Sequence, residues 1–371
     1  MNAPLKLSRP LAVTMWDFSW LERRWPGAGY EDWDLALDEL AERGYDAVRI
    51  DAYPHLVAAD GHKTWELLPE WSVQDWGSPA RCRVRVLPAL TEFIGKCAAR
   101  NLKVGLSTWF RQDLDNTRMN LADGAAHADI WLKTLAVVRD AGLLDALLYV
   151  DLCNEWPFAC WAPFFNRPGD NDHDWRSARC QTWMQTSVAN LRAEYPTLPL
   201  TYSLCLGPED PFGAGDLPFF DLLDPHIWMA GGEFYRKVDY NFERFDGKGY
   251  ENVAKHAEPL YRSNPRYWQA QLQNLIHWHA DRSRASGHPL ITTECWGIVD
   301  YKDWPLLDWG WVKELCALGT ETAAATGRWA AIATSNFCGP QFRGMWRDVA
   351  WHRRLTDLIH RAELPAEARI G

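Results

Sequence analysis

The stretch LLYVDLCNEWP, residues 147–157, decides the fold that we expect this chain to adopt. Its apolar run ends in Glu155, and Pro157 stops it shortly afterwards. A short apolar run bounded in this way is typical of a strand that is buried on both faces of a parallel sheet. The stretch PLITTECWG, residues 289–297, has the same form and ends in Glu294. Both stretches therefore predict a buried strand with a glutamate at its carboxyl end.

Outward from these two stretches, short apolar runs alternate with long amphipathic segments along the chain. The predicted strands cover residues 12–15, 47–50, 103–107, 147–152, 200–204, 224–228, 290–293 and 329–334. The predicted helices cover residues 31–43, 88–100, 125–141, 176–195, 265–286, 305–325 and 348–362. Eight strands separated by about seven or eight helical segments predict an α/β fold, the (β/α)8 TIM barrel. The competing doubly wound sheet is disfavoured because no G-x-G-x-x-G follows the first strand and no P-loop is present.

Two segments between strands are too long to be plain loops, residues 156–174 after strand four and residues 229–264 after strand six. Both follow strand carboxyl ends, which form the catalytic face of a barrel. We expect about half of their aromatic residues to line a ligand cleft and the rest to pack the loops; they are Trp156, Phe158, Trp161, Phe164, Phe165, Phe234, Tyr235, Tyr240, Phe242, Phe245 and Tyr250. No linker or composition shift divides the chain, so residues 1–371 are predicted to form a single domain.

Composition narrows the class of protein. The chain has 371 residues, of which 47% are hydrophobic and 24% charged, as in ordinary globular proteins. The formal charge is −10, which argues against nucleic acid and anionic membrane as partners, because both require a basic surface. The nine cysteines lack zinc-ligand spacing, and no secretory signal or long apolar span is present. We therefore expect reduced thiols, no metal and a cytoplasmic protein.

Two glutamates at strand ends of one barrel face can converge across its mouth, and glycoside hydrolysis is the chemistry that needs this arrangement. One carboxyl group donates a proton to the departing oxygen, while the other is ionised. A separation of about 5–5.5 Å gives retention through a covalent glycosyl-enzyme, and about 6.5–9.5 Å admits a water and gives inversion. No cofactor is needed for either route.

With NEWP closing strand four and a glutamate closing strand seven, the chain resembles the retaining glycoside hydrolases of clan A, in particular the cellulase-like families. The resemblance implies that Glu155 is the general acid/base and Glu294 the nucleophile. It further implies that Asn154 binds the sugar 2-hydroxyl, that Arg49 keeps the nucleophile ionised, and that His226 lies near the active site. From the residues alone, Arg49 could instead pair with Asp17 or Asp51, and His226 could be an ordinary core histidine.

The resemblance implies a retaining β-glycosidase acting on oligosaccharides or glycosides. Trp228 stands where the clan commonly has a tyrosine, and Ser335-Asn336-Phe337 replaces the usual strand-eight tryptophan. These departures motivate an alternative, a non-catalytic carbohydrate-binding protein on the same barrel. Transglycosylation by the same residues is a third reading, because it differs only in whether water or a sugar reaches the intermediate.

The chain contains 23 tryptophans, more than a core needs. An indole offers its face to the C–H side of a sugar and its N–H to a hydroxyl group. Five tryptophans at or just past strand ends are predicted to contribute to substrate binding: Trp16, Trp109, Trp161, Trp228 and Trp296. The polar residues that follow strands one to three are expected to bind hydroxyl groups, with Asp51 among them: Asp17, Asp51, His55, Arg111, Gln112 and Asp113.

Overall fold

Parallel strands form the centre of the fold, as the apolar runs predicted. The structure, a computed structural model, describes residues 7–166, 175–209, 216–241 and 246–370. Its largest sheet has seven strands in the order β11-β13-β1-β2-β5-β6-β7, and every neighbouring pair in it is parallel. The strands of this sheet are β1 (Leu11–Met15), β2 (Ala47–Asp51), β5 (Lys103–Ser107), β6 (Leu147–Asp151), β7 (Leu200–Thr201), β11 (Leu290–Thr292) and β13 (Trp329–Ala333).

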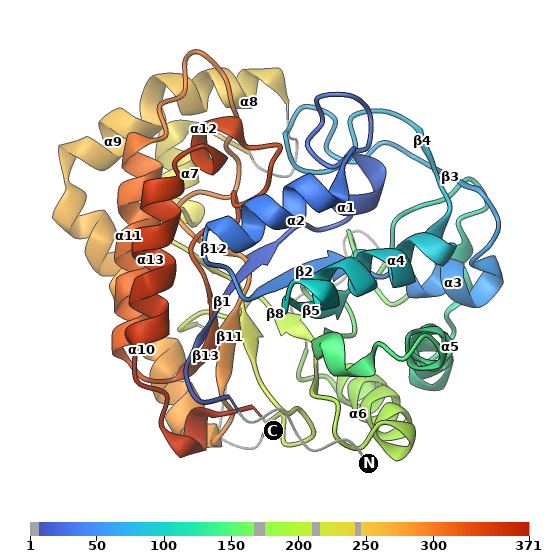
Figure 1. Cartoon of the computed structure of the whole chain (residues 1–371). Coiled ribbons are helices and arrows are strands. Elements are labelled where there is room, and N and C mark those ends of the chain that lie inside the picture. The colour runs from blue at the N-terminus through green and yellow to red at the C-terminus, as the bar shows by residue number, and fades with distance from the viewer. Residues whose placement is uncertain (1–6, 167–174, 210–215, 242–245, 371) are drawn as a thin grey trace.

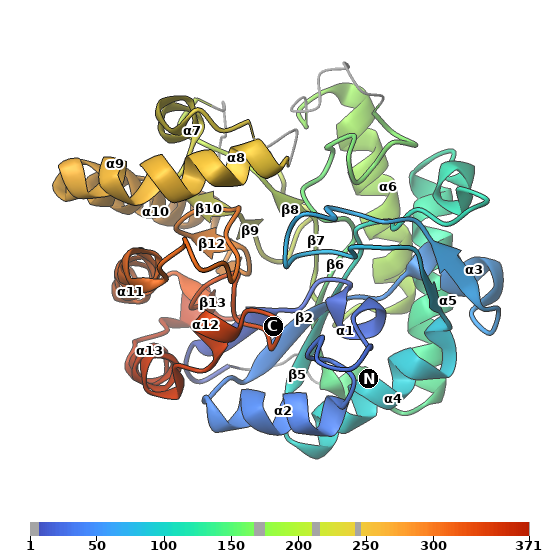
Figure 2. The same ribbon diagram turned by 90° about the horizontal axis from the view of Figure 1, so that it is seen from above.

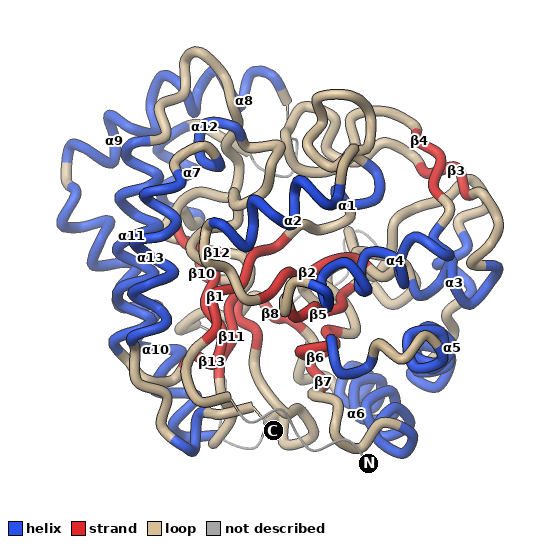
Figure 3. The backbone as a smooth tube through the Cα atoms, in the orientation of Figure 1, coloured by secondary structure: helices blue, strands red, loops and turns tan. Residues whose placement is uncertain are grey.

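Three short pairs close this sheet into a (β/α)8 barrel (Figure 3). β8 (Ser203–Leu204) continues β7 and pairs with β9 (Asp224–Pro225), and Leu223 forms a bridge with Leu290 at the start of β11. β10 (Ile227–Trp228) pairs with β12 (Cys295–Trp296). The predicted strands five, six and seven are thus each divided into two short pieces. The gaps in strands six and seven are where His226 and Glu294 lie, so the pairing is interrupted at two of the predicted site residues.

Helices surround the strands (Figures 1 and 2), and each predicted helix is present. The outer helices are α2 (Trp33–Glu42), α4 (Val86–Ala99), α5 (Gly124–Asp140), α6 (Ala178–Glu194), α10 (Pro265–Ser286), α11 (Gly310–Ala325) and α13 (Val349–Arg361). Gly142 and Gly287, which follow α5 and α10, have φ values of 73° and 79°, as expected for glycines that end helices. Among the described residues, no helix combines the length and apolar character needed to cross a membrane.

The loops at the strand carboxyl ends carry more structure than the sequence predicted. The segment after β2 contains α3 (Pro54–Asp60) and an antiparallel hairpin of β3 (Trp65–Leu67) and β4 (Cys82–Val84), which was not predicted because three-residue strands give no periodic signal. Parts of both predicted insertions, 167–174 and 242–245 with Phe242 and Phe245, lie outside the described residues. The remaining short helices are α1 (Ser19–Glu22), α7 (Gly232–Val238), α8 (Gly247–Asn252), a π-helical turn (Val253–Ala257), α9 (Glu258–Ser263), α12 (Arg343–Trp346) and 3₁₀ turns at Thr117–Asn120, Leu144–Ala146 and Ala366–Ala368.

The barrel interior is filled by side chains, as is usual for this architecture. β2, β6 and β13 are buried along their whole length, which explains the apolar sequences of β6 and β13 and means that Arg49 and Asp51 on β2 need internal partners. Gly105 on β5 faces the ring of Tyr149 on β6, and a Cβ atom at this glycine would lie 2.5 Å from that ring. The absence of a side chain at Gly105 therefore lets Tyr149 occupy the interior, where its hydroxyl group lies 3.4 Å from Asp224.

Candidate active site

The two predicted glutamates meet at one histidine. Glu155 follows β6, Glu294 lies between β11 and β12, and His226 lies between β9 and β10. His226 Nδ1 is 2.9 Å from Glu155 Oε1 and 3.6 Å from Glu294 Oε2. The sum of these distances, 6.5 Å, is the longest separation that these two carboxylate oxygens can have. Both glutamate side chains are largely buried, with 17% and 11% of their surface exposed.

The backbone of Glu155 is held in an unusual conformation. Its φ of 46° lies in the left-handed region, which side-chain-bearing residues adopt at a cost of about 1–3 kcal/mol. The Glu155 N–H donates to Ser203 Oγ over 2.9 Å, and the Trp156 N–H donates to the Ser203 carbonyl over 3.0 Å. Strand five therefore fixes the turn that carries Glu155. Asp17, Tyr53 and Phe110, which follow β1, β2 and β5, also have positive φ, so sharp turns recur around this mouth.

Arg49 on β2 connects the two strand ends beneath the glutamates. Its fully buried guanidinium group donates to Glu294 Oε1 over 3.0 Å and to Asn154 Oδ1 over 2.7 Å, and it forms an ion pair with Asp151. The ion-pair partners of Arg49 are thus Asp151 and Glu294, rather than Asp17 or Asp51. Burial alone would lower the pKa of Arg49, but the surrounding carboxylates outweigh this effect and raise it.

A second layer of polar groups orients these residues. Asp151 accepts hydrogen bonds from Ser107 Oγ over 2.6 Å and from the Ser203 N–H over 2.7 Å. Thr293 Oγ1 donates to Asp224 over 3.1 Å and accepts from Arg49 over 3.2 Å. Because each of these groups is buried and has a fixed partner, the position of Arg49 is determined from several sides.

The charges of Glu155, Glu294 and His226 depend on one another. Burial opposes ionisation of Glu155, but His226, Cys205 and Trp161 outweigh it and lower the pKa of this carboxyl group. Burial and the charge of Glu155 raise the pKa of Glu294, against the lowering effects of His226 and Arg49. Burial would lower the pKa of His226, but the two glutamates raise it to about 9. Without substrate, both glutamates therefore favour the protonated form of His226, which lies 2.9 Å from Glu155.

Two further groups contact Glu155, and one of them was not predicted. Trp161, one of the predicted binding residues, donates its indole N–H to Glu155 Oε2 over 3.0 Å. The thiol of Cys205, just after β8, lies 3.0 Å from Glu155 Oε1. Cys205 follows a strand end, as Glu155 does, but a cysteine at that place carries no chemical signal in the sequence.

Glu155, Cys205 and His226 each place one potential metal-ligand atom within 4.8 Å of the others, in the part of the chain that the structure describes. Burial, followed by the charge of Glu155, raises the pKa of Cys205 well above its ordinary value. A protonated thiol donates a hydrogen bond and is a poor metal ligand. We therefore interpret this group as a hydrogen-bonded cluster around the carboxylate of Glu155.

The five predicted tryptophans have different positions. The Arg49 guanidinium carbon lies 4.6 Å from the centre of the Trp109 ring, so Trp109 supports the arginine from below. Trp16 and Trp296 are fully buried and donate their N–H groups to the backbone carbonyls of Cys338 and Ala333. Core packing covers both rings, so their role in substrate binding stays a prediction without a contact in this structure that supports it. Trp228, at the end of β10, is half-buried and remains a predicted binding residue.

The polar residues after strands one to three are mostly structural. Asp51 is fully buried and accepts hydrogen bonds from the Tyr53 and Trp109 N–H groups, so its contacts in this structure are internal and its binding of substrate stays a prediction. His55 contacts the Arg111 carbonyl, and Arg111 forms an ion pair with Glu22. Asp113 accepts hydrogen bonds from two N–H groups of its own turn, and half-buried Gln112 accepts one from Arg118.

Asp17 and Asn336 differ from these residues because they contain buried polar atoms without partners. Asp17 Oδ2 and both amide atoms of Asn336 have no hydrogen-bond partner among the described residues, although the two side chains are 1% and 0% exposed. Asn336 follows β13, and its N–H donates to the carbonyl of Cys295, which is adjacent to Glu294. An unpaired buried amide is costly, so such a group often binds a ligand. In the sequence, Asn336 stood out only because Ser335-Asn336-Phe337 replaces the usual strand-eight tryptophan, and it was not predicted to bind substrate.

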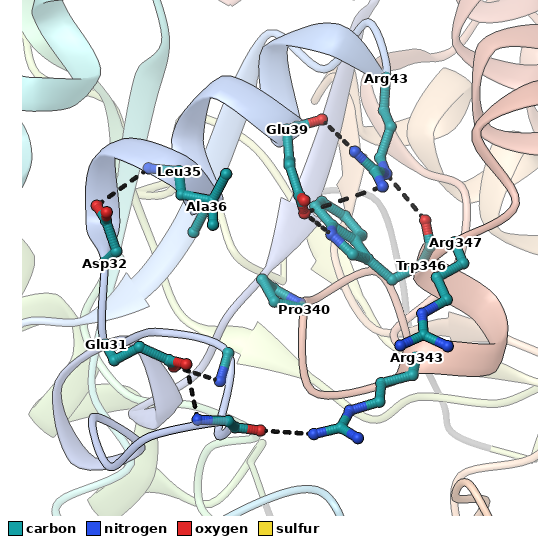
Figure 4. Close-up of a pocket in the computed structure, with 12 residues that line it drawn as sticks. Glu31, Asp32, Leu35, Ala36, Glu39, Arg43, Pro340, Arg343, Trp346 and Arg347 are labelled. Atoms are coloured by element: carbon teal, nitrogen blue, oxygen red, sulfur yellow. Dashed lines mark hydrogen bonds and ion pairs between the residues drawn. The ribbon is translucent and has the colours of Figure 1, made fainter.

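A separate cavity of about 230 Å³ lies between α2 and the segment around α12 (Figure 4). Arg43, Arg343 and Arg347 are near it, together with Glu31 and Glu39. The Arg43 side chain donates to the Trp346 carbonyl, while Glu31 accepts hydrogen bonds from two backbone N–H groups. Because Arg43 and Glu31 already have internal partners and none of the lining residues belongs to the glutamate site, the cavity is not part of the candidate active site.

Comparisons with known proteins agree with this architecture. The profile of a family described as cellulase-like, with the fuller description sugar-binding cellulase-like, matches residues 13–360. A crystal structure of a candidate glycoside hydrolase from Parabacteroides distasonis is similar to this chain at 52% identity, with a TM-score of 0.93 and coverage of 97% of this chain and 96% of that one. No curated protein matches.

More distant solved structures have the same fold. GH5_18 from Streptomyces cattleya, solved in complex with GlcNAc, is 12% identical with a TM-score of 0.54, over 97% of this chain and 82% of that one. An endo-β-1,4-mannanase from Thermotoga petrophila is 11% identical with a TM-score of 0.55, over 96% of this chain and 78% of that one. At these identities the likeness concerns the barrel alone.

Proposed function

Because this chain belongs to the sugar-binding cellulase-like family, we propose that it is a retaining β-glycosidase that hydrolyses oligosaccharides or glycosides. The proposal rests on one observation, that Glu155 and Glu294 both contact the same nitrogen atom, Nδ1 of His226. Their facing oxygens lie no further apart than 6.5 Å, the lower limit of the range of about 6.5–9.5 Å that is typical of inverting enzymes. The 52% identical structure, described as a candidate glycoside hydrolase, supports the same class of reaction.

The first step forms a covalent intermediate. A carboxylate oxygen of Glu294 attacks the anomeric carbon, the bond from that carbon to the glycosidic oxygen breaks, and the proton of Glu155 passes to the departing oxygen. In the second step Glu155 takes a proton from water, whose oxygen attacks the anomeric carbon. The ester bond to Glu294 then breaks, which releases the sugar and restores both carboxyl groups.

The proton needed for the first step is supplied at the Glu155–His226 pair. Without substrate, His226 is the largest favourable influence on the ionised form of Glu155. A glycosidic oxygen that replaces His226 as the partner of Glu155 removes the largest influence that lowers the pKa of this carboxyl group, so burial then acts against only the contacts from Cys205 and Trp161. Arg49 remains against Glu294 and favours its ionised form. Substrate binding therefore shifts the pair towards a protonated Glu155 and an ionised Glu294, the states that their proposed roles require.

Asn154 and Trp161 complete this site. Arg49 occupies the Asn154 carbonyl oxygen, while Asn154 Nδ2 has no partner among the described residues and can donate to the sugar 2-hydroxyl. Trp161 fixes the second oxygen of Glu155, which leaves Oε1 to face the histidine or the substrate. These contacts position the groups before the substrate arrives, which lowers the reorganisation required for reaction.

The test is covalent trapping with activated 2-deoxy-2-fluoro-β-glycosides of glucose, mannose and galactose type, together with a 5-fluoro-β-glycoside of N-acetylglucosamine type. We expect one of them to add a single glycosyl group, detected by intact mass, and peptide mapping to locate it on Glu294. Glu294→Gln should give no adduct, with its thermal midpoint retained. Glu155→Gln should still form the adduct, because the activated leaving group needs no acid, but should release it slowly. An adduct on another residue would exclude the assigned roles.

The alternative of a sugar-binding protein without activity is favoured by the two departures at Trp228 and at Ser335-Asn336-Phe337. Calorimetric binding of a sugar without adduct or turnover across the panel would support that alternative. Transglycosylation uses the same intermediate, and it is distinguished by the ratio of transfer to hydrolysis when an acceptor sugar is added.

A further inference from the structure

One segment extends across the mouth of the barrel. Residues 71–76, here called the crossing segment, belong to the loop of the β3–β4 hairpin after strand two. The Gln74 side chain donates to Asp300 Oδ1, and the indole nitrogen of Trp76 lies 3.3 Å from the carbonyl oxygen of Val299. From the other side, Lys302 donates to the Val73 carbonyl over 2.7 Å. The loop after strand two is therefore joined to the loop after strand seven.

The two ends of the crossing segment contact opposite parts of the rim. Trp71 packs against Trp161, with 4.8 Å between ring centres, and Trp161 hydrogen-bonds Glu155. Trp76 packs against Phe337, after strand eight, and Phe342, at 5.9 and 5.6 Å. Since Trp76 and Gln74 are only 5% and 6% exposed, these contacts form a packed wall rather than a loose loop.

Trp71 packs near Glu155 through Trp161, whereas the part of the wall that residues 74–76 form lies on the opposite side of the site. β6, which Glu155 follows, is the fourth strand of the ring and β13 is the eighth, so their ends face each other across the mouth. The leaving group must lie next to the acid/base, Glu155. The sugar that is transferred to Glu294 therefore extends towards strands one, seven and eight, where residues 74–76 are packed against Val299, Asp300 and Phe337.

Unpartnered polar groups are found on this same side. Asp17 follows β1 and Asn336 follows β13, and these two strands are neighbours in the sheet. Asp17 Oδ2 accepts hydrogen bonds, and the Asn336 amide both donates and accepts them, which suits vicinal hydroxyl groups. A terminal sugar would satisfy these buried groups, whereas a continuing chain would have to pass through the packed wall.

We propose that the crossing segment closes the glycone side of the site, so that the protein removes single sugars from the non-reducing end, with Asp17 and Asn336 binding the hydroxyl groups of the terminal sugar. This inference rests on the proposed function. It specifies the substrate as a chain end or a monoglycoside rather than the interior of a polymer.

The test compares aryl β-monoglycosides with aryl β-biosides of the sugar that labels Glu294, and it measures the initial release of the same phenol. If the site holds only one sugar on its glycone side, kcat/KM for the monoglycoside should exceed kcat/KM for the bioside at least about a hundredfold. Equal values, or a faster bioside, would overturn the inference while leaving the glycosidase intact. Absence of both adduct and phenol release for every sugar would instead refute the proposed function.

Variants locate the effect in the wall. Trp76→Ala and, separately, Gln74→Ala should raise the rate on the bioside relative to the monoglycoside at least about tenfold. Arg81→Ala, on the same hairpin loop but 62% exposed and paired only with Glu66 at the surface, is the matched control and should keep the wild-type ratio. Asn336→Ala should lower kcat/KM for the monoglycoside about tenfold, the effect of one lost hydrogen bond at a buried site. Unchanged ratios in both wall variants, with thermal midpoints near wild type, would contradict the assignment.

Discussion

Replacing Arg49 by methionine should destabilise the protein strongly, because the arginine neutralises carboxylates that water cannot reach. Asp151 is fully buried and Glu294 is nearly so, and both form ion pairs with the Arg49 guanidinium group. Methionine keeps much of the side-chain volume against Trp109 but removes the charge and the hydrogen bonds to Asn154 and Ser107. Breaking a buried ion pair from one side typically costs about 3–5 kcal/mol.

This free energy translates into a measurable shift of the melting temperature. The entropy of unfolding is about 2.1 cal/mol/K per residue, or about 0.8 kcal/mol/K for the whole chain. We therefore expect the thermal midpoint of Arg49→Met to fall by about 4–6 °C in differential scanning calorimetry. Arg81→Met is the matched control, because its exposed ion pair with Glu66 is worth at most about 1 kcal/mol.

A double variant separates the charge effect from lost packing. In Arg49→Met/Asp151→Asn the buried charge is removed together with its partner, so part of the lost stability should return. A loss below about 1 kcal/mol for Arg49→Met, or no recovery in the double variant, would refute the reasoning, since the arginine would then not be compensating a buried charge.

Two further predictions concern the surroundings of Glu155. The pKa of His226 is raised from 6.5 to about 9, so the stability that its protonated form contributes is complete below pH 6.5 and is lost as the pH rises through 9. In urea unfolding, the stability difference between wild type and His226→Gln should therefore shrink between pH 6.5 and 9. A difference that stays constant over this range would contradict the prediction. Because burial keeps the Cys205 thiol protonated 3.0 Å from Glu155, iodoacetamide at pH 7 should not inactivate the wild type through this residue. A loss of activity that Cys205→Ser prevents and Cys160→Ser does not would show that a thiolate forms there.

The barrel was predictable because its strands are buried on both faces. Each apolar run had to be a strand or a short buried helix, and the eight runs with helices between them left few topologies. The positions of Glu155 and Glu294 followed from the same runs, since each glutamate directly follows one. The structure places both residues at the mouth, 2.9 and 3.6 Å from His226.

The tryptophans were less predictable, because a strand-end position does not determine which way a ring points. Trp161 reaches Glu155, whereas Trp16, an equally plausible residue in the sequence, packs within the core and hydrogen-bonds Cys338. The crossing segment was missed for another reason: its hairpin has strands of only three residues, and its position depends on contacts with loops far away in the sequence. Asn336 could not be predicted for a similar reason, because a buried amide without hydrogen-bond partners can be recognised only when the positions of its neighbours are known.

The left-handed backbone at Glu155 has a consequence for the history of this chain. Glycine adopts that conformation without strain, so exchanging the glutamate for glycine would relieve about 1–3 kcal/mol of backbone strain while Ser203 still held the turn. The same exchange would leave the buried proton of His226 without its nearest carboxylate, which costs more than the strain that is relieved. A lineage that no longer needed the carboxylate would therefore have to replace His226 as well, and homologues that have abandoned turnover should be recognisable by the loss of both residues.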